Sequence, residues 1–253
     1  MATSPKSGEK TPDQQQLPAQ KAQREPQDAA YARAQDAIAT ARTSDASDLT
    51  LSGDDFSDLT ELPPDVGTLT ALTDLSLSGT QVSDISALSG LTGLMGLSLS
   101  RTPVSDISAL SGLTGLTWLS LSRTEISDIS ALSGLKGLTG LYLSDTAVSD
   151  ISALSGLRGL STLDLMRTSV SDISALSGLT ALSGLSLLGT PVNDLSPILP
   201  LTQLVDAPKY GGLAFRNTAA ARADRRIAEI AGIQDDAKRA TDLCAYLKNV
   251  TPT

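Results

Sequence analysis

A block of nine residues, SDISALSGL, recurs every 22 residues through the middle of the chain. Its five identical copies occupy residues 83–91, 105–113, 127–135, 149–157 and 171–179. Each copy follows a stretch of the form Leu-x-x-Leu-x-Leu, and the units begin at Leu72, Leu94, Leu116, Leu138, Leu160 and Leu182. A period of this length is typical of a solenoid, in which successive units stack and contact only their neighbours. The sequence therefore predicts an elongated repeat domain.

The residues of one unit predict a short strand followed by a compact return segment. Leucine and serine alternate in Leu97–Ser100, so the two leucines point to one side and the serines to the other. Stacked units pair such strands in parallel, about 4.7–4.9 Å apart, and bury the leucines in one continuous core. Val104, Ile107, Leu110 and Leu113 are expected to point inward from the return segment. The predicted fold class is α/β, with parallel strands on one face and short helical or 3₁₀ turns on the other.

Two polar columns repeat with the same period. A threonine follows each strand, where its buried hydroxyl is expected to bond turn backbone that the strand leaves unpaired. An aspartate precedes each return turn, where it is suited to cap the turn by accepting backbone N–H groups, which lowers its pKa. A calcium ladder is the alternative for the stacked carboxylates, but the Gly-rich Asp repeat of calcium-binding β-rolls is absent. The columns are Thr80, Thr102, Thr124, Thr146, Thr168 and Thr190, and Asp84, Asp106, Asp128, Asp150, Asp172 and Asp194.

The repeat resembles the 22-residue class of leucine-rich repeats found in bacterial internalins, whose motif is LxxLxLxxNxIxDIxxLxxLxx. The "VSDISALSGL" units from Val82 to Leu179 match this motif, with threonine in place of asparagine. An earlier and longer unit, "LTLSGDDFSDLTELPPDVGTLTAL", looks like the typical class with LPxxIxxLxxL. The resemblance implies a curved, right-handed solenoid with parallel strands on its concave face, and it implies protein binding as the activity.

The differences between units indicate the binding surface. Thirteen of the 22 columns are identical in the five units from Leu72 to Ala181, and the changes concentrate in the strand and just after it. These are side chains that alternation places on the exposed, concave side. Trp, Tyr and Arg are enriched at binding hot spots, and Trp118 is the single residue most expected to bind a partner, the alternative being an incidental exposed aromatic. The predicted partner-binding residues are Trp118, Tyr142, Arg101, Arg123, Asp145, Asp164, Met166 and Arg167.

Composition shifts divide the chain into four parts. Residues 1–28 are polar and have almost nothing to bury, so they are predicted to form a disordered tail. Residues 29–45 are predicted to form an N-terminal capping helix, with Tyr31, Ala34 and Ile38 on one face. About seven leucine-rich coils are expected in residues 46–204. Residues 205–253 are predicted to form a C-terminal cap with one strand and two helices, the first of them capped by Thr218 and running to about Ile230.

Charge and residue usage exclude several classes of function. The formal net charge is −9, and the repeat region holds most of the acidic excess, which argues against nucleic-acid and anionic-membrane partners. The sequence has no histidine, so no Ser-His-Asp or Cys-His arrangement and no histidine metal site can form. A carboxylate pair, Asp145 with Asp164, is the alternative that would serve acid–base chemistry. We expect no enzymatic activity, no cofactor and no metal.

The leading hypothesis is a non-enzymatic bacterial module that binds a partner protein through its concave face and acts as a monomer. Its start, MATSPKSGEK, lacks an apolar signal segment, and no wall anchor is seen, unlike in secreted internalins. A single cysteine fits a reducing compartment, so the expected location is the cytoplasm. The alternative is a secreted effector or adhesin-like binder of a host protein or glycan, with the polar N-terminus as its secretion signal.

Overall fold

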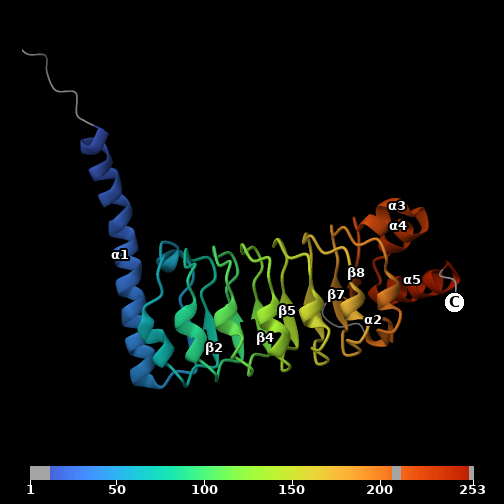
Figure 1. Ribbon diagram of the computed structural model, residues 1–253, viewed down its shortest axis with the longest axis horizontal. Helices are drawn as coiled ribbons and strands as arrows, with labels where there is room; N and C mark the ends of the chain where they lie inside the picture. The colour runs from blue at the N-terminus through green and yellow to red at the C-terminus, as the bar shows by residue number, and fades with distance from the viewer. Residues whose placement is uncertain (1–11, 207–211, 251–253) are drawn as a thin grey trace, which may run out of the picture.

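The computed structural model describes residues 12–206 and 212–250, and within them the array forms one sheet of eight parallel strands in sequence order. Neighbouring strands pair so that equivalent leucines lie side by side, as Leu75 does with Leu97 and Leu97 with Leu119. The sheet is open and extends along the length of the molecule (Figure 1). The strands are β1 (Asp48–Thr50), β2 (Asp74–Ser76), β3 (Gly96–Ser98), β4 (Trp118–Ser120), β5 (Gly140–Tyr142), β6 (Thr162–Asp164), β7 (Gly184–Ser186) and β8 (Leu213–Ala214).

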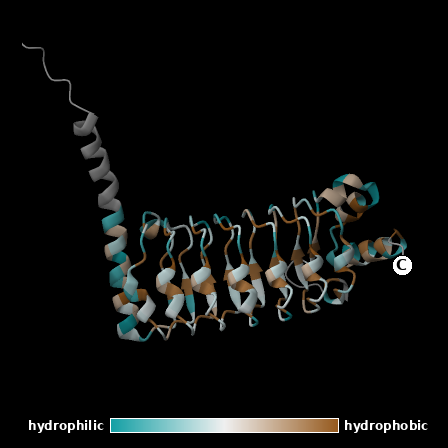
Figure 2. Cartoon of the chain, in the orientation of Figure 1, coloured by the Kyte–Doolittle hydropathy of each residue, from teal (hydrophilic) through white to brown (hydrophobic). Residues whose placement is uncertain are grey.

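Each strand up to β7 is followed by a return through a short 3₁₀ helix, which confirms the predicted fold class. The core lies between the sheet and these turns, and hydrophobic segments recur in every coil along the array (Figure 2). Val104, Ile107, Leu110 and Leu113 are all buried, as the pattern predicts. The 3₁₀ helices are η1 (Asp54–Phe56), η2 (Pro64–Thr68), η3 (Ser86–Gly90), η4 (Ser108–Leu110), η5 (Ser130–Gly134), η6 (Ser152–Leu154), η7 (Ser174–Leu176) and η8 (Ser196–Ile198).

Helix α1 (Pro12–Ser44) covers the first coil and closes that end of the core. Ala30, Ala34 and Ile38 are fully or almost fully buried against the coil. The helix begins before the predicted capping helix and takes in residues 12–28, which the sequence analysis assigns to a disordered tail. Gln, Ala, Lys, Arg and Glu, which have high helix propensity, make up most of this stretch, whereas Pro18 and Pro26 within it disfavour a helix interior. Residues 1–11 of the predicted tail lie outside the described residues.

The opposite end is closed by four helices and β8. They are α2 (Thr202–Asp206), α3 (Ala219–Ala223), α4 (Arg225–Ala231) and α5 (Asp236–Val250). Three helices follow β8, where the sequence analysis expects two. The predicted helix from Thr218 to Ile230 breaks at Asp224, whose backbone is extended and whose carboxylate accepts the N–H groups of Arg226 and Ile227. An aspartate in this conformation is a strong N-cap, so a second helix starts there.

A buried arginine joins the last strand to the C-terminal helix. Arg239 is 8% exposed, and its guanidinium donates a 2.6 Å hydrogen bond to the carbonyl of Leu213 in β8. It also donates to the carbonyl of Ile233 and pairs with the carboxylate of Asp236. The sequence analysis did not identify this role, because the two carbonyls come from segments that only the fold brings to the helix.

Across the part of the chain that the structure describes, no helix is long and apolar enough to cross a bilayer.

Candidate functional site

The exposed surface of the sheet, which we call the strand face, carries the outward residues of each strand. Half of these residues in β1 to β7 are glycine or serine, for example Gly96 and Ser98 in β3, and most of the others are aspartate or threonine. Small side chains leave the surface low, so the few large residues stand out from it. Trp118 at the start of β4 is 40% exposed, and it is one of only three large exposed hydrophobic side chains among the described residues. The strand face is therefore low and polar, and the aromatic side chain of Trp118 projects from it.

The aromatic projection is a pair of rings from neighbouring coils. The rings of Trp118 and Tyr142 have centroids 5.8 Å apart and planes tilted by 51°. Gly140 pairs with Trp118 across the two strands, and a Cβ on Gly140 would lie 3.1 Å from Cδ1 of the indole. A larger residue at 140 would displace the indole from its present position. The structure thus brings together two of the predicted binding residues and shows that a glycine makes room for them.

A second group of predicted residues lies in the turns that follow the strands. Arg101, Arg123, Asp145 and Arg167 occupy equivalent positions and all have left-handed backbone, with φ between 55° and 60°. Asp145 lies between two arginines: its carboxylate is 3.4 Å from Nε of Arg123 and 2.8 Å from Nε of Arg167. Among the residues that the structure describes, no ion pair involves Arg101. The sequence analysis missed the left-handed backbone, although Gly79 and Gly189 in the same column were a signal for it.

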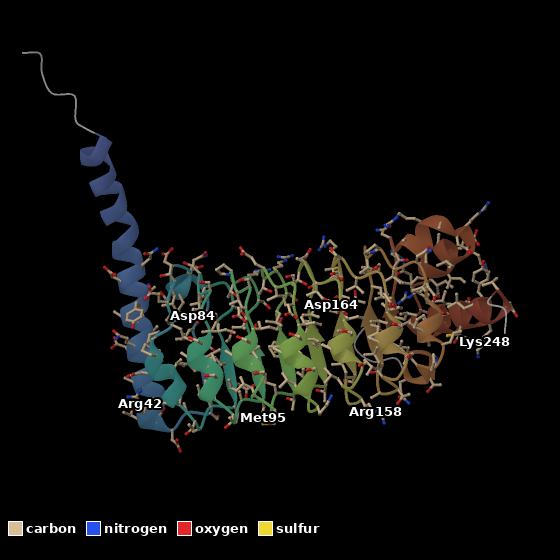
Figure 3. All side chains as sticks on the ribbon, in the orientation of Figure 1. Arg42, Asp84, Met95, Arg158, Asp164 and Lys248 are labelled. Atoms are coloured by element: carbon tan, nitrogen blue, oxygen red, sulfur yellow. The ribbon has the colours of Figure 1, made fainter. Side chains whose placement is uncertain are left out.

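The remaining predicted residues line a hollow on the C-terminal half of the strand face. Tyr142, Asp164 and Met166 contribute to this hollow, whose volume is about 260 Å³. Asp164 lies in the middle part of the array (Figure 3). Its Oδ1 accepts the backbone N–H of Met166 at 2.9 Å, so the carboxylate is oriented within its own turn. The side chains from β5 and β6 are therefore close neighbours, whereas the arginines lie beyond the strand ends.

A second hollow of about 340 Å³ lies on the N-terminal half of the strand face. It extends from β1 to β4, and Trp118 forms its boundary on the β4 side. Asp48 and Asp74 supply its charged groups, and Gly96 lies between Asp74 and Trp118 in the strand register. The sequence analysis did not select the two aspartates. The repeat alignment could have indicated Asp74, because it occupies the same column of the repeat as Trp118.

The threonine column has the structural role that its position predicts. Each hydroxyl donates to the carbonyl of the leucine three residues earlier, as Thr80 does to Leu77 at 2.9 Å and Thr124 to Leu121 at 2.6 Å. All six threonines are at most 7% exposed. Equivalent bonds are made by Thr102, Thr146, Thr168 and Thr190.

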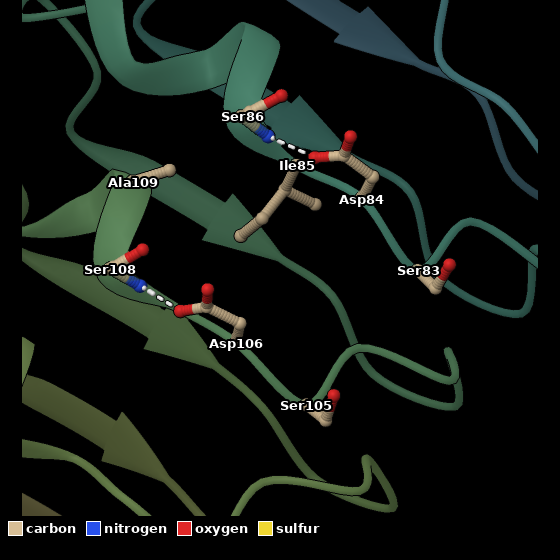
Figure 4. A pocket seen from close by; sticks show the side chains of 8 residues that line it. All are labelled: Ser83, Asp84, Ile85, Ser86, Ser105, Asp106, Ser108 and Ala109. Atoms are coloured by element: carbon tan, nitrogen blue, oxygen red, sulfur yellow. Dashed lines mark hydrogen bonds between the residues drawn. The ribbon is translucent and has the colours of Figure 1, made fainter.

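The aspartate column also bonds the return turns, one residue earlier than a formal N-cap. Asp84 Oδ1 accepts the N–H of Ser86 at 2.8 Å, and Asp106 accepts from Ser108 at the same distance (Figure 4). The N-cap of η3 is Ile85, so the aspartate precedes it and forms an Asx turn, which corrects the predicted N-cap. Asp128, Asp150, Asp172 and Asp194 repeat this bond.

These bonds change the acidity of the aspartates. The backbone N–H of the following serine is the largest cause that lowers the pKa of Asp84, Asp106, Asp150 and Asp172, and the serine side chain adds to it. Repulsion from the neighbouring Asp84 raises the pKa of Asp106, but it is the smallest of the causes. The N–H bond therefore outweighs the repulsion that stacked carboxylates exert on one another.

A calcium ladder is the alternative role for the aspartate column. The hollow between Asp84 and Asp106 is lined mainly by serines and has a volume of about 280 Å³. Among residues 12–206 and 212–250, no group of three or more His, Cys, Asp or Glu side chains is placed to hold a metal ion. The carboxylate pair considered for acid–base chemistry, Asp145 and Asp164, is held by two arginines and by a backbone N–H respectively.

Comparisons with known proteins support the assignment of the array. An internalin C2 from Listeria monocytogenes is 31% identical over 62% of this chain and 78% of that protein, with a TM-score of 0.56. A second internalin of the same species is 25% identical with a TM-score of 0.52, over 64% of this chain and 54% of that protein. A leucine-rich repeat protein of Leptospira interrogans, 22% identical over 62% of this chain and 41% of that protein, shares the fold with a TM-score of 0.56.

No family model matches the sequence, and a search of curated proteins finds no match. In this chain each repeat coil carries a parallel strand and a 3₁₀ turn. Leucine-rich repeat proteins are typically non-enzymatic interaction modules. By its repeat, its fold and its identity to internalin C2, the chain belongs to the internalin-like leucine-rich repeat proteins.

Proposed function

We propose that this protein is a non-enzymatic module that binds a partner protein through its strand face. The observation that carries the proposal is the exposed Trp118, held against Tyr142 on strands whose other outward residues from β1 to β7 are Gly, Ser, Thr and Asp. A large aromatic side chain exposed to water is unfavourable unless a partner covers it, and Trp and Tyr dominate the binding energy of many interfaces. The pair offers one projecting anchor, with a hollow on either side of it.

The pattern of variation supports the same surface. Five units share thirteen identical columns, including all the leucines of the strand and return segment. Five of the nine variable columns lie in the strand and the turn just after it, where a side chain can change without affecting the core. The other four are the positions before the strand, such as Lys136 and Arg158, and one buried position that changes only between Val and Ile. A scaffold that is constant inside and variable on one face is suited to recognition.

We also propose an oligomeric state and a cellular location for the protein. Helix α1 packs on β1 and helix α5 packs on β8, so helices cover both ends of the sheet, and we propose a monomer. We propose a bacterial protein that acts in the cytoplasm. Secretion as an effector, with a host protein as partner, is the alternative. Fractionation of a culture into cytoplasm and medium, together with light scattering of the purified chain, tests these points.

A comparison of two single variants tests binding through the strand face. Trp118→Ala removes the projecting ring, and Met95→Ala is the matched control. Met95 is 48% exposed, lies on the same long edge of the array as Arg158 but several coils away from it (Figure 3), and lines neither hollow. For a partner identified with the wild type, we expect Trp118→Ala to weaken binding at least tenfold and Met95→Ala to change it less than twofold. Equal binding by wild type and Trp118→Ala would exclude the proposal.

A glycan is the second candidate ligand, because Trp118 and Tyr142 are residue types that stack on sugar rings. The 51° tilt between the two rings gives no flat platform for adjacent sugars, so the geometry favours a protein ligand. A glycan array probed with wild type and with Trp118→Ala separates the two. Binding that depends on Trp118 would favour the glycan.

A further inference from the structure

The N-terminal hollow of the strand face contains a charge arrangement that the scaffold does not require. Asp48 and Asp74 pair directly across β1 and β2, so two exposed carboxylates stand side by side on one face of the sheet. Like charges in directly opposed positions destabilise a sheet. Among the residues that the structure describes, neither carboxylate has an ion-pair partner, and Asp74 Oδ2 accepts the hydroxyl of Thr73 at 2.8 Å. Asp145, by contrast, is held by two arginines.

The shape of the hollow directs one of these carboxylates toward the aromatic residue. Asp74 leans over the next strand, because a Cβ on Gly96 would lie only 2.3 Å from Asp74 Oδ1. Trp118 follows Gly96 in the register, so a glycine separates the carboxylate from the indole. Two strand spacings, roughly 9.5 Å, separate the backbones of Asp74 and Trp118. The result is an open space of about 340 Å³ between anionic groups and the indole.

From this arrangement we infer that the hollow receives an arginine side chain of the partner protein. A guanidinium stacks on the face of an indole and forms paired hydrogen bonds with a carboxylate at the same time. The inference rests on the proposed function and specifies its chemistry: the partner contributes a basic segment that lies across β1 to β4. The arginine relieves the repulsion between Asp48 and Asp74, which the free protein tolerates.

The charge distribution of the array agrees with a basic partner. Residues 29–204 hold seven Lys and Arg against eighteen Asp and Glu. Three arginines, Arg101, Arg123 and Arg167, lie in the turns just after the strands. None of them lines the hollow. An acidic face raises the association rate of a basic partner, and this effect weakens with salt.

A selection of 12-residue peptides displayed on phage, performed on the full chain, tests the inference. We expect the selected peptides to contain arginine and to lose at least tenfold in affinity with Asp74→Asn and with Trp118→Ala. Asp58→Asn is the control for charge, because it removes one exposed carboxylate of the first coil that lines neither hollow, and we expect less than a twofold change. Trp118 is the only tryptophan in the chain, so its emission follows binding of tryptophan-free peptides to the wild type and to the aspartate variants, while calorimetry measures binding to Trp118→Ala.

The outcomes separate the inference from the proposed function. Peptides that depend on Trp118 but bind Asp74→Asn as tightly as wild type would uphold strand-face binding and overturn the arginine site. Selection of peptides without basic residues, or of no peptide at all, would also overturn it. Peptides that bind all variants equally would count against both proposals. Asp74→Asn removes a like-charge contact, so its urea midpoint should be at least that of wild type, which distinguishes lost binding from lost folding.

Discussion

The rings of Trp118 and Tyr142 lie 5.8 Å apart, at the centre of the strand face and on adjacent strands. The contact is diagonal, since Trp118 pairs with Gly140 and Tyr142 pairs with Ser120 in the register. Diagonal neighbours on a sheet are within reach of aromatic side chains. Tyr142 therefore shields one side of the indole while the other side borders the N-terminal hollow.

Replacement of Tyr142 changes the environment of Trp118 in the absence of any partner. Tyr142→Ala removes the shielding ring, so we expect a red shift of Trp118 emission and stronger quenching by acrylamide. Tyr142→Phe keeps the ring and is the control, with emission as in wild type. We expect a loss of about 0.5–1.5 kcal/mol in unfolding free energy for Tyr142→Ala, the usual contribution of an aromatic pair. Unchanged quenching in Tyr142→Ala would contradict the ring contact.

The left-handed turn at Arg101 predicts a difference between two small substitutions. Its φ is 60°, a conformation that glycine adopts freely and that alanine does not. Arg101→Gly is therefore expected to be more stable than Arg101→Ala by about 1 kcal/mol. Urea unfolding of both variants measures this difference. At an ordinary helix or strand position the alanine variant would be the more stable of the two. If Arg101→Ala were the more stable variant, the backbone at this position would not be left-handed.

Arg239 is expected to hold the C-terminal cap together. Arg239→Met keeps the length of the side chain but leaves the carbonyl of Leu213 without its 2.6 Å bond and the carbonyl of Ile233 without its donor. We expect the cap to lose about 2–4 kcal/mol, because buried acceptors become unsatisfied. Hydrogen exchange measures this loss as reduced protection in β8 and α5.

Arg239→Lys serves as the control for charge alone. Lysine lacks the planar fork that reaches several acceptors, so we expect only partial recovery of protection. Full recovery in Arg239→Lys would show that the positive charge, and not the guanidinium geometry, holds the cap. Protection in β2 to β5 should be the same in both variants, since coils contact only their neighbours.

The aspartate column predicts an acid-dependent loss of stability. The pKa values of Asp84, Asp106, Asp150 and Asp172 are lowered in the folded chain by the serine N–H groups. A lowered folded pKa stabilises the fold above the unfolded value of about 4, and this stabilisation is lost as the pH falls through the folded pKa values. Urea midpoints measured from pH 6 to pH 2.5 follow this loss.

A variant with asparagine at these four positions should show a flatter pH profile. Asparagine accepts the same N–H bond through its side-chain oxygen but does not titrate in this range. At pH 6 the variant is expected to be less stable than wild type, and near pH 2.5 the two should converge. Parallel profiles would mean that other carboxylates cause the acid sensitivity.

The solenoid could be predicted from the sequence because its information is local and repeated. Leu97, Leu99 and Ile107 are buried for reasons contained in one unit, and the same reasons apply in every copy. The hydroxyl of Thr102 bonds a carbonyl three residues away, so its partner also lies within the unit. Alternation and period therefore predicted the sheet, the short helical or 3₁₀ turns and the two structural columns, although the aspartates form Asx turns instead of the predicted N-caps.

The sequence by itself determined the array, the inward residues and the face on which the copies differ. Only the tertiary structure decided that Trp118 meets Tyr142, that Asp145 lies between two arginines, and that Arg239 reaches the carbonyl of Leu213. Each of these contacts joins residues from different coils or from a cap, and it depends on the direction in which a side chain leans. Where each side chain leans is set by the space that the neighbouring coil leaves, as Gly96 does for Asp74 and Gly140 for Trp118.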